Sequence, residues 1–199
     1  MERFFAEGSA NWRQVQDLPN FSFICGYCST TVSSVKGYKL GTHGDASGQQ
    51  IGAIYICPNC GGPNFFAPGG ERFPTPRLGK SVNHVPLDLN ALYEEARRST
   101  GQNCFTGAVL LCRKMLMNIA VQQGAIEGLK FIEYVNYLAD KGFVPPNGKH
   151  WVDHIRKKGN EATHEIAVMS EQDARDLLSF IEMLLRFIYE FPSMVPEQP

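Results

Sequence analysis

Cys25-Gly26-Tyr27-Cys28 and Cys57-Pro58-Asn59-Cys60 are the two stretches that decide the fold of the first part of this chain. Each is a Cys-x-x-Cys pair, and 28 residues separate the two pairs. A short run of β-forming residues precedes each pair, at 21–24 and 51–56, and such runs predict strands. The sequence therefore predicts two strand-fed turns whose four sulfurs converge on one point.

Four thiolates in this arrangement suit one tetrahedral zinc ion at metal–sulfur distances of about 2.3 Å. Because the four cysteines leave no coordination position open, we expect one structural Zn²⁺ ion rather than a catalytic one. The pattern is that of a zinc ribbon, with Cys25, Cys28, Cys57 and Cys60 as ligands. Unrelated reduced cysteines or a redox-active pair fit the paired spacing less well. A sheet this small has little core of its own, so zinc should supply much of its folding free energy.

The remaining N-terminal segments complete a small β domain. Further extended segments are predicted at 31–40 and 64–67, with a hairpin loop at 41–50 that contains His43. The segment 68–77 is rich in Pro and Gly, and it predicts a linker that joins neither helix nor sheet. We place the domain boundary near residue 80, which separates a zinc-ribbon domain (1–80) from a helical domain (81–199).

Aromatic side chains are frequent in the predicted ribbon. Two uses of them remain open, because they can pack the small sheet or stack on nucleic-acid bases. These residues are Phe21, Phe23, Tyr27, Tyr38, Tyr55, Phe65 and Phe66.

The second part of the chain carries apolar residues at helical spacing. Helices are predicted at about 88–100 with an Asp88 or Asn90 cap, 103–123, 129–141, from about 149, and 170–191 with a Ser170 cap. The helix at 103–123 is apolar almost all round, which marks it as the central one, and Cys104 and Cys112 are expected to be small core residues. The predicted class is α+β: a small β zinc ribbon followed by a mostly α five-helix bundle.

The last helix has more apolar surface than one bundle face uses, so we expect it to contact another subunit.

Arg113 lies among apolar residues of the central helix. A buried guanidinium needs partners, and Asn160, Glu161 or Glu165 could supply one. In the alternative, the side chain extends to the protein edge.

The segment 155–165 has an unusual polar pattern. In a helix each step of four residues advances only about 40° around the axis, so Arg156, Asn160 and His164 would share one face. Two interpretations are open: a buried polar network that fixes helix packing, or a site that binds phosphate and transfers protons.

Three segments carry a resemblance to a known family: Glu95-Ala96, Arg113-Lys114-Met115-Leu116, and Ile155-Arg156 with Gly159-Asn160, Ala162 and His164. Over about residues 85–191 the chain resembles the domain of unknown function 4145 family, which is similar to the HEPN superfamily. The resemblance implies a five-helix, often dimeric bundle, often behind a zinc ribbon, and a role in prokaryotic defence or conflict with mobile elements.

Some HEPN proteins are ribonucleases that use an Arg and a following His from two subunits. The resemblance then implies His164 as general acid and base and Arg156 as the group that stabilises the phosphate. Seven residues lie between Arg156 and His164, one more than the motif has, whereas Lys158 has a suitable spacing. Asn160 would position one of these groups and Arg113 would support them.

Composition excludes some classes of function. The formal net charge is −1, so no global field attracts nucleic acid. No apolar run reaches the roughly 18 residues that span a bilayer, and the N-terminus lacks a signal pattern, so we expect a cytoplasmic protein without a membrane partner.

Two functions follow. The first is a binding module for RNA, DNA or a partner protein, acting as a homodimer through its helical domain. The second is a metal-independent, toxin-like ribonuclease with Arg156 and His164 at a dimer interface. The sequence leaves open whether the protein is an enzyme.

Overall fold

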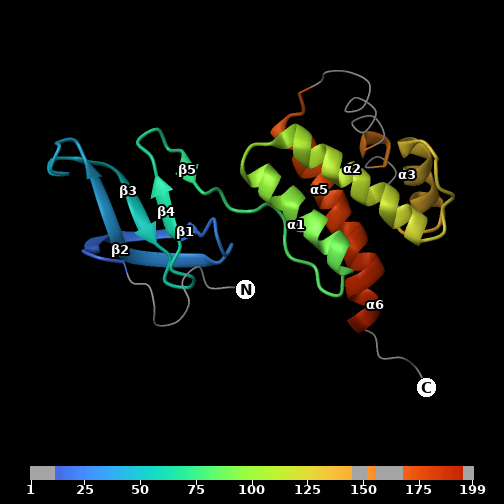
Figure 1. Cartoon of the computed structure of the whole chain (residues 1–199), viewed down its shortest axis with the longest axis horizontal. Helices are drawn as coiled ribbons and strands as arrows, with labels where there is room; N and C mark the ends of the chain where they lie inside the picture. The colour runs from blue at the N-terminus through green and yellow to red at the C-terminus, as the bar shows by residue number, and fades with distance from the viewer. Residues whose placement is uncertain (1–11, 145–151, 156–167, 195–199) are drawn as a thin grey trace. The chain divides into compact units, whose positions relative to one another are not determined.

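The computed structural model describes residues 12–144, 152–155 and 168–194. The chain divides into two compact units, Met1–Arg77 and Leu78–Pro199. The described part of the first unit contains the strands and that of the second contains the helices (Figure 1). The α+β class predicted from the sequence is confirmed.

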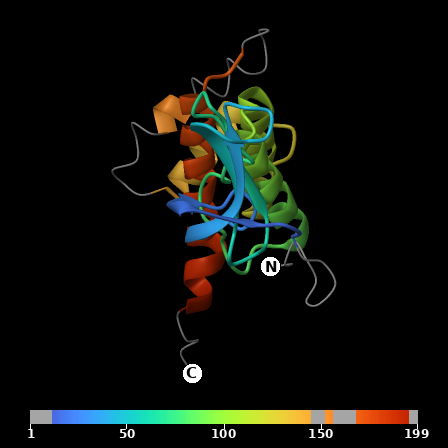
Figure 2. The same cartoon turned by 90° about the vertical axis from the view of Figure 1, so that its left-hand side faces the viewer.

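The first unit is one antiparallel sheet whose strands pair in chain order. Its strands are β1 (Gln16–Ile24), β2 (Thr31–Gly41), β3 (Gln50–Ile56), β4 (Pro63–Phe66) and β5 (Arg72–Phe73). The four predicted extended segments are confirmed, and the strands twist visibly against one another (Figures 1 and 2). The prediction that 68–77 joins no sheet is wrong at β5. A turn in which Gly70 N donates to Ala67 O (3.0 Å) returns the chain, so that Arg72 and Phe73 pair with β4.

Four aromatic side chains form the packing surface of this sheet. Phe21 lies 4.9 Å from Phe66 and 5.2 Å from Tyr55 between ring centroids, and Phe23 lies 5.3 Å from Phe66. For these four rings the structure supports the packing use, because the rings contact one another. Phe21 still exposes 41% of its surface, so the cluster also reaches the surface of the unit.

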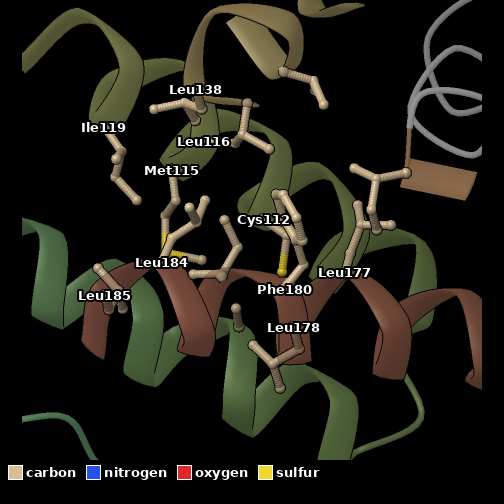
Figure 3. Packing of buried hydrophobic residues seen from close by; sticks show 14 of the residues in the cluster. Cys112, Met115, Leu116, Ile119, Leu138, Leu177, Leu178, Phe180, Leu184 and Leu185 are labelled. Carbon is tan, nitrogen blue, oxygen red and sulfur yellow. The ribbon is translucent and has the colours of Figure 1, made fainter. Parts of the chain in front are cut away.

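The second unit is built around its central helix. Its elements are α1 (Leu87–Gly101), α2 (Phe105–Gln122), α3 (Phe131–Asp140), a helical turn at 152–155, α5 (Glu171–Leu185), a π-helical turn η2 (Arg186–Glu190) and α6 (Phe191–Met194). Helix α2 packs against α1, α3 and α5, which confirms its predicted central place. Figure 3 shows Met115 of α2 near Leu184 of α5 in the core, where both side chains are fully buried. No helix in the described ranges is long and apolar enough to cross a membrane.

The helix ends test three sequence predictions. Ser170 caps α5 as predicted: its hydroxyl accepts from Asp173 N at 3.2 Å, and the Asp173 carboxylate accepts from Ser170 N at 3.0 Å. The predicted cap of α1 is wrong, because the helix starts before Asp88 and Pro86 occupies the N-cap without a side-chain cap. Cys104 is not a core residue, since it lies exposed at the N-cap of α2; Cys112 is buried as expected.

Residues 78–86, which we call the strap, run without helix or strand along α1 and the C-terminal helical segment, with bends at 78–79 and 83–84. Arg97 of α1 donates from Nε to Leu78 O and from Nη2 to Gly79 O, both at 2.8 Å. On the α5 side, Lys80 N donates to the Glu182 carboxylate at 2.9 Å. Further along, the Glu190 carboxylate accepts from the backbone and side chain of Asn83 (3.1 and 3.0 Å). The strap is therefore part of the helical unit.

We expect Glu190 to make the stability of the helical unit depend on pH. The hydrogen bond from Asn83 N, together with the Arg186 charge, holds the pKa of Glu190 below its ordinary value. A depressed folded pKa gives stability that is complete above the unfolded pKa of about 4.3 and is lost as the pH falls through the folded value. Glu190→Gln should therefore lower the urea midpoint at neutral pH, and its difference from wild type should stay constant down to about pH 4 and shrink only as the pH falls further.

The matched control for this experiment is Glu171→Gln. Glu171 pairs with Arg175 on an exposed helix face, where an ion pair contributes little. If Glu190→Gln and Glu171→Gln give the same midpoint at every pH, the strap bonds do not stabilise the unit.

Candidate metal centre

The two Cys-x-x-Cys turns bring their four sulfurs together. Cys25, Cys28, Cys57 and Cys60 are all buried, and their Sγ atoms all lie within 4.8 Å of one another. Cys25 Sγ lies 3.7 Å from Cys60 Sγ, and Cys28 Sγ lies 3.8 Å from Cys57 Sγ. Zinc–sulfur bonds of about 2.3 Å in a regular tetrahedron require sulfur–sulfur edges of about 3.8 Å. The cluster therefore has the size of a site for one metal ion.

The backbone of the two turns follows one plan. In the first turn Ser29 N donates to Cys25 O (2.8 Å), and in the second Gly61 N donates to Cys57 O (2.8 Å). The residue after each second cysteine has a positive φ, 57° at Ser29 and 73° at Gly61. This conformation costs glycine little, and it closes each turn so that both of its sulfurs face the same side.

The segment that follows β5 packs against the Cys25–Cys28 turn. A side chain at Gly26 would place its Cβ 2.0 Å from Pro74 O, which no packing tolerates. Only glycine fits at position 26, because Pro74 of the predicted linker packs against this turn.

Two asparagine side chains, which sequence reasoning missed, donate hydrogen bonds to the sulfurs. Asn64 Nδ2 lies 3.4 Å from Cys25 Sγ, and Asn59 Nδ2 lies 3.5 Å from Cys28 Sγ. Both asparagines belong to the second half of the sheet, and both reach across to the first cysteine pair. Each asparagine follows a proline within the run Cys57-Pro58-Asn59-Cys60-Gly61-Gly62-Pro63-Asn64, but this pattern alone does not indicate a hydrogen bond to sulfur.

The thiols of the cluster differ in how readily they ionise. Burial raises the pKa of the Cys57 and Cys60 thiols. Burial also opposes ionisation of Cys28, but hydrogen bonds from Asn59 and Thr30 outweigh it and lower the pKa of that thiol to about 6. Four buried thiolates would repel one another unless a dication balanced them. Since the four sulfurs surround the ion completely, the site would stabilise the fold and offer no open position for a substrate.

In the helical unit Arg113 is buried, with 9% of its surface exposed. Its guanidinium carbon lies 4.2 Å from the ring centroid of Phe131, and burial lowers the pKa of Arg113. The structure thus rejects the alternative that the side chain extends to the protein edge. Its Nη1 has no acceptor among the residues that the structure describes.

The other predicted site residues of the helical unit fall outside the described residues. These are Arg156, Lys158, Asn160 and His164, together with the expected Arg113 partners Glu161 and Glu165. The helical turn at 152–155 leads to them. There His154 Nε2 lies 2.8 Å from Asp176 of α5, which ties this turn to the last long helix.

The C-terminal helical segment carries a groove of about 410 Å³. It is lined by Ser179, Glu182, Met183, Arg186, Phe187 and Phe191. Phe187 and Phe191 lie 5.3 Å apart between ring centroids and expose 46% and 42% of their surfaces. These two exposed rings belong to the additional apolar surface that the sequence predicted for the last helix.

A protein-family model matches the second part of the chain. The model described as "Domain of unknown function (DUF4145)" matches residues 94–197, just over half of the chain. The chain belongs to the DUF4145 family. The DUF4145 match begins within α1 and includes Arg113 and the segment that holds His164. No curated protein and no solved structure matches the chain.

Proposed function

We propose that this DUF4145 protein is a non-catalytic binding protein whose N-terminal unit is a zinc ribbon that presents its sheet to a partner protein. One observation carries the proposal: four buried sulfurs lie at the edge lengths of a tetrahedral zinc site. A zinc ion with four cysteine ligands stabilises the surrounding fold and has no coordination position open for a substrate.

Charge and exposure favour a protein as the partner over nucleic acid. Between Trp12 and Arg77 the chain has five Lys/Arg and three Asp/Glu, and four thiolates on one Zn²⁺ contribute about −2. The zinc-bound unit is therefore nearly neutral and lacks the positive field that binding to phosphates requires. Apolar side chains are instead exposed over its strands. They include Phe21, Ile24, Val35, Leu40, Ile51 and Phe73.

We propose further that the protein is a homodimer and that the last helix provides the contact. Phe187, Phe191 and Met194 recur at helical spacing and are all exposed. An exposed apolar stripe of this kind is characteristic of a helix that packs against a partner.

A ribonuclease is the second candidate, and the buried Arg113 favours it. Its Nη1 has no acceptor among the described residues, and a partner from the segment that carries Asn160 and His164 would suit it. In that case His164 would move protons, with Arg156 or Lys158 stabilising the phosphate.

One experiment separates the two candidates. Full-length protein and His164→Ala are incubated with total cellular RNA without added metal, and the RNA is resolved on a denaturing gel. The binding function predicts intact RNA with both proteins. Cleavage by wild type and none by a folded His164→Ala would overturn it in favour of the ribonuclease.

The binding surface is tested by photo-crosslinking in cells. A photoreactive phenylalanine analogue replaces Phe73, which exposes 52% of its surface, and the same analogue at the exposed Gln172 of α5 serves as control. We expect a discrete protein adduct from position 73 that disappears in a Cys60→Ser background. An adduct that nuclease digests, or equal adducts from both positions, would contradict the proposal.

A further inference from the structure

The side chain of Asn64 is fully buried and uses all of its polar atoms on the metal centre. Its Oδ1 accepts from Gly26 N at 2.8 Å. Its Nδ2 donates to Cys25 Sγ at 3.4 Å and to Gly62 O at 3.0 Å. One carboxamide therefore contacts a ligand sulfur, the backbone of the first turn and the backbone beside the second.

We propose that Asn64 is the positioning residue that determines how long the ribbon retains its metal. This inference rests on the metal binding proposed above. A metal ion leaves a closed four-sulfur site only when the two turns separate, and Asn64 bonds both of them. Its N–H also stabilises the negative charge on Cys25. Partners of this kind typically change metal affinity 10- to 100-fold.

Asn59 provides a matched comparison within the same chain. It is also an asparagine after a proline, and it donates to Cys28 Sγ at 3.5 Å. Its Nδ2 also donates to the Thr30 hydroxyl at 3.2 Å. Because Asn59 is exposed, water replaces its bonds when the side chain is removed. No water reaches the fully buried position of Asn64, so its loss leaves Gly26 N and the sulfur without partners.

The test uses the full-length chain loaded with Co²⁺ or Zn²⁺, and it measures metal transfer to an excess of a coloured chelator. We expect Asn64→Ala to lose metal about 10- to 100-fold faster than wild type, and Asn59→Ala to stay within about threefold of wild type. The sulfur-to-cobalt absorption band gives a second readout. It should move to longer wavelength in Asn64→Ala, since a thiolate that has lost a donor gives up an electron more easily. General destabilisation of the sheet does not predict that shift.

If the Asn64→Ala protein does not bind the metal, Asn64→Asp tests the role of this side chain instead. Its side chain keeps its size and the acceptor for Gly26 N but replaces the donor to Cys25 with an oxygen, so it too should release metal faster. If wild type takes up no Co²⁺, the metal proposal itself fails. If wild type loads and both Asn64 variants release metal at its rate with an unchanged band, the role of Asn64 is overturned.

Discussion

Cys60→Ser is expected to unfold the N-terminal unit while the helical unit stays folded. Apparent zinc-binding energies of structural sites are roughly 10–16 kcal/mol, which matches or exceeds the total stability of a typical domain, about 5–15 kcal/mol. Apart from the four cysteines, few side chains of the sheet are deeply buried, among them Phe23 and Tyr55. Limited proteolysis should therefore cut freely within 12–77 and spare 87–144, and elemental analysis should find one zinc per wild-type chain and none in the variant.

Cys104→Ser is the matched control, because Cys104 is exposed in the helical unit. It should keep both the zinc and the wild-type protease pattern. Removal of the metal from wild type by a strong chelator should reproduce the Cys60→Ser pattern. A Cys60→Ser protein that keeps its zinc and its protease resistance would show that the four sulfurs do not hold the ion.

Phe180→Ala should produce the largest loss of stability in the helical unit. Phe180 is fully buried and lies between α5 and α2 near Cys112 (Figure 3). Truncation of a buried Phe costs about 3–5 kcal/mol from lost burial and the cavity left behind. Urea unfolding followed by the helical circular dichroism signal, at one fixed protein concentration, measures this loss.

Phe187→Ala on the same helical segment separates packing from association. Because the Phe187 side chain is nearly half exposed, its removal should cost less than about 1 kcal/mol within one chain. Under the dimer proposal, Phe187→Ala should instead lower the mass measured by light scattering toward that of a monomer. Equal stability losses in the two variants would show that the assignment of core and surface on this helix is wrong.

The cysteine cluster was predictable because it depends on local spacing. Two Cys-x-x-Cys pairs after β-forming runs identify the four cysteines that converge without any tertiary knowledge, since each turn supplies two sulfurs within four residues. Asn59 and Asn64 were not predictable as sulfur partners. Their hydrogen bonds cross from one half of the sheet to the other, and no local pattern specifies which asparagine reaches which sulfur.

Other features depended on contacts between distant residues. No local pattern in 78–86 indicated a partner for this segment, but Glu190, 107 residues after Asn83, binds it to the helical unit. Arg113 shows the same limit. From its apolar neighbours along α2, a buried and an exposed Arg113 side chain were equally consistent with the sequence. The structure shows that it is buried, because the ring of Phe131 from α3 packs against the guanidinium.

The sequence by itself determined the α+β class, the first four strands, the central helix, the Ser170 cap and the four cysteines that cluster. All of these follow from periodicity, capping chemistry or ligand spacing, which act over a few residues. Only the tertiary structure decided the place of β5, the exposure of Cys104, the burial of Arg113 and the hydrogen bonds of Asn64. Each of these depends on which distant groups exclude water from a side chain, and exclusion of water is a property of the assembled fold.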